Sequence, residues 1–166
     1  MEDLFMKEYY NTLLKLSYIY VKDRTIAQDI VQDVFVKMIE KKDQFRGDST
    51  YKTYLMKITI NRCHDYLRSW SYRNHVLTNN FYQMFTKESP ESALIAKNGK
   101  TNIALQILKL KPKYREVIVL YYYEDFSVKE IAELLDCSEN TVKTRLSRGR
   151  IQLREYLEVF EVEERN

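Results

Sequence analysis

The sequence contains few of the residues that interrupt helices or cross-link chains. Its 166 residues include three glycines, two prolines and two cysteines. So few chain breakers, together with the lack of alternating apolar and polar runs bounded by turn residues, predict an all-α fold. Cys63 and Cys137 lie far apart and outside any metal-ligand spacing, so we expect neither a disulfide framework nor a metal site.

Long apolar runs are also missing, although 45% of the residues are hydrophobic. No run approaches the roughly 20 apolar residues that a membrane-spanning helix needs. The first ten residues, MEDLFMKEYY, lack the basic and then apolar order of a secretory signal. A cytoplasmic protein is therefore expected. The sequence also lacks a glycine-rich phosphate loop and a Ser-His-Asp set, so we expect neither an enzyme nor a cofactor.

The most informative stretch is SVKEIAELLDCSENTVKTRLSRGR, residues 127–150. Ser127, followed three residues later by Glu130, predicts a capping box at the start of a short helix. Residues 136–138 have the composition of a turn, and Ser138 is a candidate N-cap for a second helix. Two helices around such a turn form a helix-turn-helix pattern, whose second helix enters the DNA major groove.

The side chains of this second helix separate into an apolar side and a polar side. At about 100° per residue, the packing side comprises Val142, Leu146, Gly149 and Leu153. The opposite side carries groups that can bond base edges in the major groove: Asn140, Lys143, Thr144, Ser147 and Arg148. Arg145 and Arg150 flank this side and are expected to contact phosphates. A solvated basic helix is the alternative, but the agreement of cap, turn and both sides favours DNA binding.

The first half of the chain predicts two amphipathic helices. One runs from Leu4 to Val21, and a capping box of Thr25 with Gln28 is expected to open the next. This second helix carries Asp29 and Asp33 on one side. Like charges four residues apart disfavour a helix by a few tenths of a kcal/mol, so the acidic side invites a basic partner. A solvated helix face is the alternative, and the residues alone leave both open.

The sequence FRGDSTY, residues 45–51, predicts a polar turn that leads into a long helix over residues 52–70. Around its start, aromatic residues alternate with cations, as on surfaces that stack unpaired bases and follow a sugar-phosphate backbone. Aromatic residues at helical spacing more often pack in a core, so this signal is weak by itself. Residues 72–88 lack periodicity and are expected to link two small helical domains, 1–71 and 89–166.

Within the C-terminal domain, Ser89 and Pro90 predict a helix start. This helix is expected to continue past Gly99 to Lys109. Pro112 then opens a further helix that leads to the helix-turn-helix. The second domain is therefore expected to be a small helical bundle.

Two motif sets, in this order, resemble the extracytoplasmic-function (ECF) group of sigma-70 family factors. Residues 27–35 (AQDIVQDVF) with 45–67 (FRGDSTYKTYLMKITINRCHDYL) are similar to sigma region 2, and residues 110–150 to region 4. The resemblance implies an alternative sigma factor, without catalytic activity, that binds core RNA polymerase and promoter DNA. It also implies regulation by an anti-sigma protein, often membrane-anchored. The other hypothesis is a stand-alone helix-turn-helix regulator, which would need neither the acidic side nor residues 45–61.

The resemblance also assigns roles to individual residues. Polymerase binding falls on Asp29, Gln32, Asp33 and Phe35. Recognition of the −10 element, with capture of a flipped base, falls on Phe45, Arg46, Gly47, Asp48, Ser49, Thr50, Tyr51, Lys52, Tyr54, Asn61, Arg62 and Arg68. The −35 readers fall on Lys143, Thr144, Ser147 and Arg148, flanked by Arg145 and Arg150. Tyr54 stands where the family usually has tryptophan, and a tyrosine offers less stacking area.

Overall fold

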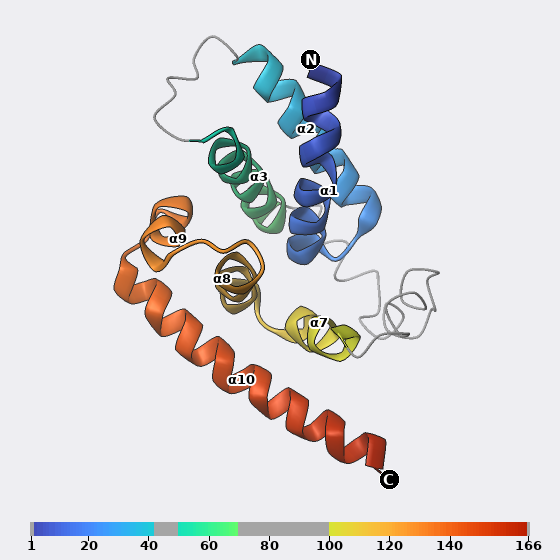
Figure 1. The fold of residues 1–166 in the computed structure, drawn as a ribbon, viewed down its shortest axis with the longest axis vertical. Helices are drawn as coiled ribbons and strands as arrows, with labels where there is room; N and C mark the ends of the chain where they lie inside the picture. Colours follow the sequence, from blue (N-terminus) through green and yellow to red (C-terminus); the bar gives the residue numbers. More distant parts are fainter. Residues whose placement is uncertain (1, 42–49, 70–99, 166) are drawn as a thin grey trace. The chain divides into compact units, whose positions relative to one another are not determined.

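The computed structural model describes residues 2–41, 50–69 and 100–165 (Figure 1). These residues form helices, and no strand occurs among them, which confirms the all-α prediction. None of the described helices is both long and apolar enough to cross a membrane. The chain divides into two compact units, Met1–Arg73 and Asn74–Asn166. The predicted linker, the helix start at Ser89 and residues 45–49 of the predicted base-capture turn lie outside the described residues.

The first unit packs three helices against one another: α1 (Glu2–Val21), α2 (Arg24–Glu40) and α3 (Tyr51–Arg68) (Figure 1). Each helix contributes apolar side chains at helical spacing to one core, including Leu13, Leu16, Val31, Val34, Leu55 and Ile60. Burying such a side chain contributes about 1.5–3 kcal/mol. This shared core fixes which sides of α2 and α3 remain at the surface.

The start of α2 differs from the prediction. The side chain of Asp23 accepts a hydrogen bond from the backbone N–H of Ile26 at 3.0 Å, so Asp23 is the N-cap and the helix begins at Arg24. The expected capping box of Thr25 with Gln28 is wrong, because Thr25 already lies in the first turn. Aspartate is at least as good an N-cap as threonine, and here it stands two residues earlier.

The second unit contains α7 (Lys100–Lys109), α8 (Pro112–Tyr122), α9 (Val128–Leu135) and α10 (Glu139–Arg165). The long helix α10 contacts each of the other three, and Figure 1 shows it running past α8 and α7. Their core includes Ile107, Leu110, Val117, Ile118, Ile131, Leu134, Val142 and Leu146. The N-terminal half of α10 therefore packs against α8 and α9. This packing determines which side of α10 is exposed.

Gly149 lets α10 approach α8 closely. A Cβ atom at this position would lie 3.1 Å from Cγ1 of Ile118 and 3.5 Å from Cβ of Tyr114. A Cβ atom at 3.1 Å would require the Ile118 side chain to shift by a few tenths of an ångström, so the close packing of the two helices favours glycine here. The predicted packing role of Gly149 is therefore confirmed.

The helix-turn-helix follows the predicted caps. The Ser127 hydroxyl accepts from the Glu130 N–H at 3.2 Å, and the Glu130 carboxylate accepts from the Ser127 N–H at 2.7 Å. These hydrogen bonds lower the pKa of Glu130. Ser138 caps the second helix by accepting from the N–H of Thr141 at 3.1 Å. Between the helices, Asp136 adopts a left-handed conformation, with φ of 52°, which ends α9.

Candidate nucleic-acid and protein interfaces

The predicted DNA-reading residues occupy the exposed side of α10. Lys143, Thr144, Ser147 and Arg148 are exposed, as is Asn140 near the start of the helix. On the opposite side, the predicted packing residues Val142, Leu146 and Gly149 are buried. The structure therefore brings the predicted reading residues together on one rigid surface, which we call the reading face (Asn140, Lys143, Thr144, Ser147 and Arg148).

The first turn of α8 borders the reading face. The ring of Tyr114 is buried, whereas its hydroxyl lies at the surface beside Arg148. A hydrogen bond from Arg148 lowers the pKa of Tyr114, and the charges of Lys113 and Arg148 act in the same direction. The ammonium group of Lys113 lies 5.0 Å from the centroid of the Tyr114 ring. Thus α8 places Tyr114 beside Arg148 and adds the cation Lys113 at the edge of the reading face. The sequence analysis did not identify this cation.

The two arginines predicted to contact phosphates are both engaged by α8. Nη1 of Arg145 lies 3.5 Å from Oε1 of Glu116, whose side chain is only 5% exposed. Nε of Arg150 donates to the hydroxyl of Tyr122 at 2.7 Å. The Arg150 guanidinium also lies 5.6 Å from the centroid of the Tyr122 ring. Within the second unit, therefore, both side chains connect α10 to α8.

We expect Arg145→Ala to lower the stability of the second unit without changing the salt dependence of DNA binding. Removing the guanidinium takes one partner away from the buried Glu116 carboxylate. This loss should lower the free energy of unfolding by about 1–3 kcal/mol. A lost phosphate contact would instead lower the slope of log affinity against log salt by about one. Lys143→Ala, which removes an exposed cation from the same helix, is the control that should lower this slope. A lower slope in Arg145→Ala as well, measured by fluorescence anisotropy with duplex DNA, would contradict the structural role.

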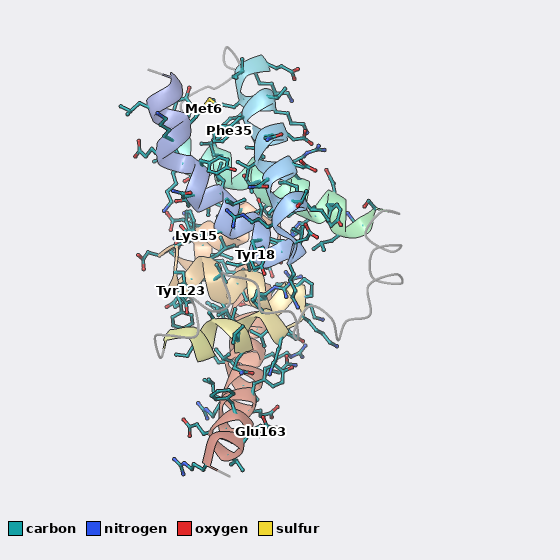
Figure 2. The ribbon with its side chains drawn as sticks, turned by 90° about the vertical axis from the view of Figure 1, so that its right-hand side faces the viewer. Met6, Lys15, Tyr18, Phe35, Tyr123 and Glu163 are labelled. Atoms are coloured by element: carbon teal, nitrogen blue, oxygen red, sulfur yellow. The ribbon has the colours of Figure 1, made fainter. Side chains whose placement is uncertain are left out.

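On the first unit, α2 carries the predicted polymerase-binding residues. Asp29, Gln32 and Asp33 are exposed and form the surface that we call the acidic face. Phe35 does not join them, because it is 4% exposed and packs toward Met6 of α1 (Figure 2). Its ring therefore supports the acidic face from inside the unit.

Two apolar side chains extend the acidic face along α2. Val36 is 54% exposed and Ile39 is 52% exposed. Together with Met6 and Tyr10 of α1 they line an apolar groove. The sequence analysis did not single out Ile39, although it lies seven residues after Gln32 and thus on the same helix face.

One ion pair connects the acidic face to α3. Nη2 of Arg62 bonds Oδ2 of Asp33, across 29 residues of sequence. Arg62 was expected at DNA and Asp33 at a basic partner outside the chain, so the structure pairs two residues that the sequence analysis had assigned to different ligands. Asp29, one turn before Asp33, forms no ion pair within the described residues.

The described part of the predicted −10 surface lies on α3. Thr50 is the N-cap of this helix, since its hydroxyl accepts from the N–H of Thr53 at 3.2 Å. Along α3, Tyr51, Asn61 and Arg68 are exposed, and Lys52 and Tyr54 are half-buried. Arg68 pairs with Asp65 of its own helix at 2.9 Å. The predicted residues Phe45, Arg46, Gly47, Asp48 and Ser49 lie outside the described residues.

Comparisons with known proteins match each half of the chain to a family. Residues 5–72 match the family Sigma-70 region 2, and residues 100–153 match Sigma-70, region 4. ECF RNA polymerase sigma factor SigW of Bacillus subtilis is 32% identical over 160 residues, covering 90% of this chain and 84% of SigW. RNA polymerase sigma factor YlaC of the same organism is 29% identical over 170 residues, covering 99% and 95%.

A solved structure shares the fold. The sigma factor RpoE of Bartonella quintana, solved in complex with the anti-sigma factor NepR, superposes with a TM-score of 0.74 at 24% identity. The match covers 96% of this chain and 99% of RpoE. Region 2 and region 4 thus occur in the order that the two motif sets predicted. The chain belongs to the extracytoplasmic-function group of RNA polymerase sigma factors.

Proposed function

We propose that this sigma factor binds core RNA polymerase through the acidic face of α2, and reads promoters through α3 and the reading face of α10. The observation that carries this proposal is that one chain presents an exposed acidic surface on region 2 and an exposed basic surface on region 4. A stand-alone operator-binding regulator needs only the second surface. The protein acts in the cytoplasm and has no catalytic role of its own.

Promoter opening needs no chemistry from the chain. Extruding a base from a duplex costs a few kcal/mol of unstacking, and a surface that binds only the extruded form couples recognition to melting. We assign this capture to the segment Phe45–Lys52, supported by Asn61 and Tyr54. Arg62 and Arg68 contact the sugar-phosphate backbone beside it. On region 4, Lys143, Thr144, Ser147 and Arg148 read the −35 element in the major groove.

An anti-sigma factor is a further partner. One structural relative, RpoE, was solved in complex with the anti-sigma factor NepR, and another, CnrH, in complex with the cytosolic domain of CnrY. We propose that an anti-sigma protein, either anchored in a membrane or not, covers the polymerase-binding surface of this chain. The exposed apolar pair Val36 and Ile39, beside Asp29 and Asp33, suits such a competitor.

Charge reversal at Asp29 tests polymerase binding. We expect Asp29→Arg to weaken the complex with core polymerase at least tenfold, because like charges across an interface cost several kcal/mol. Asp29 is exposed and forms no ion pair within the described residues, so folding should be retained. Co-elution in size-exclusion chromatography and titration with labelled chain measure the effect.

Glu8→Arg is the matched control, since it makes the same charge change at an exposed residue of α1. This variant should bind core polymerase as the wild type does. If the folded wild-type chain, free of any anti-sigma factor, formed no complex with cognate core enzyme, the polymerase assignment would fail. The stand-alone regulator would then be the better hypothesis, to be tested by selection of duplex operators.

A further inference from the structure

The ion pair between Asp33 and Arg62 joins two surfaces with different expected ligands. Asp33 belongs to the acidic face of α2, whereas Arg62 follows Asn61 on the predicted DNA surface of α3. The Asp33 side chain is 54% exposed and the Arg62 side chain 32%. Nε of Arg62 is buried without a hydrogen-bond partner. The Arg62 guanidinium is therefore partly buried, and its Nη2 atom bonds Asp33 of α2.

The contact uses Nη2 of Arg62 and Oδ2 of Asp33, and each charge partly offsets the other in the free chain. While Asp33 holds the guanidinium, the positive charge of Arg62 is offset and directed at α2. A DNA phosphate must compete with the Asp33 carboxylate for the same donor. In the same way, a basic side chain of the polymerase must compete with Arg62 for Asp33. A ligand that binds Asp33 therefore makes the Arg62 guanidinium more available to DNA, and a ligand that binds Arg62 makes the Asp33 carboxylate more available to polymerase.

We propose that Asp33 is a positioning residue for Arg62: it withholds the guanidinium from DNA in the free chain, and contact of Asp33 with polymerase releases Arg62 to the −10 backbone. This inference rests on the proposed function, because it takes the two ligands from there. The coupling is reciprocal, so DNA that binds Arg62 also frees Asp33 for polymerase.

The size of the coupling follows from the exposure of the pair. A partly exposed ion pair changes an equilibrium by about twofold to fivefold. Salt screens exposed charges, so the effect should shrink as ionic strength rises. The Arg68–Asp65 pair lies within α3 and does not reach α2, and Asp29 has no ion pair within the described residues. These two sites supply matched controls for the charge changes at Arg62 and Asp33.

The first experiment measures binding of the full chain, without polymerase, to a labelled single-stranded oligothymidylate by fluorescence anisotropy. Oligothymidylate suits this test because backbone contacts do not depend on base sequence. We expect Asp33→Asn to raise affinity at low salt about twofold to fivefold more than Asp29→Asn does. Both variants remove one negative charge from the same helix face, but only Asp33→Asn releases Arg62. The gain should disappear in the double variant Asp33→Asn with Arg62→Ala.

The second experiment measures the reciprocal effect on core polymerase in the absence of DNA. Arg62→Ala should raise the affinity for core polymerase about twofold to fivefold, because Asp33 loses its internal partner. Arg68→Ala removes an equal charge from the same helix and should leave this affinity unchanged. Circular dichroism of each variant verifies that the helices are retained.

Equal gains from Asp33→Asn and Asp29→Asn, or an unchanged core affinity in Arg62→Ala, would overturn the coupling while leaving the proposed function in place. If Arg62→Ala did not weaken oligothymidylate binding in the Asp33→Asn background, Arg62 would not be a DNA contact. The proposed release of Arg62 to DNA would then be wrong. Failure of the wild-type chain to bind core polymerase would reject the proposed function itself. The three failures are therefore distinguishable.

Discussion

Arg148→Ala is expected to lower discrimination at one base pair of the −35 element by about 1–3 kcal/mol, which is roughly fivefold to 150-fold. An arginine can donate two hydrogen bonds to the O6 and N7 atoms of guanine, and alanine replaces neither. Arg148 is exposed on α10 and lies beside Tyr114 of α8.

The measurement compares affinities for a set of duplexes that differ by single base pairs across the −35 element. Arg148→Ala should flatten the preference at one position and leave the others unchanged. Arg154→Ala provides a control, because Arg154 is an exposed arginine of the same helix, beyond the reading face. It should not change the preference at any position. An equal loss on every duplex in Arg148→Ala would make Arg148 a phosphate contact instead of a reader.

The sequence was sufficient to predict the helix-turn-helix because its determinants are local. The capping box of Ser127 with Glu130 and the Ser138 cap each span three residues, and the apolar period places Val142, Leu146 and Gly149 on one side. The reading face is simply what remains exposed. The cap of α2 was missed because Asp23 and Thr25 are both good caps two residues apart, and sequence places helix ends only to within a few residues.

The side-chain pairings between helices could not be predicted, because they depend on how the helices pack. Asp33 with Arg62 and Glu116 with Arg145 are each 29 residues apart, and Tyr122 with Arg150 is 28. A helical pattern shows which residues leave the core but not which surface residue of another helix they meet. The sequence therefore indicated surface cations on α3 and α10, and it left open whether DNA or the protein itself engages them.

The burial of Phe35, unlike the pairings between helices, could have been predicted from the sequence. Val31, Val34 and Met38 are buried in α2, and Phe35 stands four residues after the first of them. That spacing places its ring on the packing side. The resemblance grouped Phe35 with the exposed residues of the acidic face, whereas its spacing from Val31 places it in the core.

Gly149→Leu is expected to reduce the free energy of unfolding of the second unit by about 2 kcal/mol or more. A Cβ atom alone would lie 3.1 Å from the side chain of Ile118, which is buried at 1% exposure and would have to shift. Leucine adds three further carbons, and overpacking of a filled core costs about 1–3 kcal/mol and occasionally more. Leucine also favours a helix over glycine by about 0.8 kcal/mol, so any net loss underestimates the steric cost.

The consequence extends to promoter recognition because Gly149 follows Arg148 directly. If α10 moves away from α8, Tyr114 no longer supports Arg148, and −35 discrimination should fall together with stability. Ser147→Leu is the matched comparison: it places the same side chain on the exposed side of α10, where surface changes usually alter stability by no more than about 0.5 kcal/mol. It should weaken DNA binding without lowering the unfolding midpoint in chemical denaturation. Unchanged stability in Gly149→Leu would mean that close packing of α10 on α8 does not position the reading face.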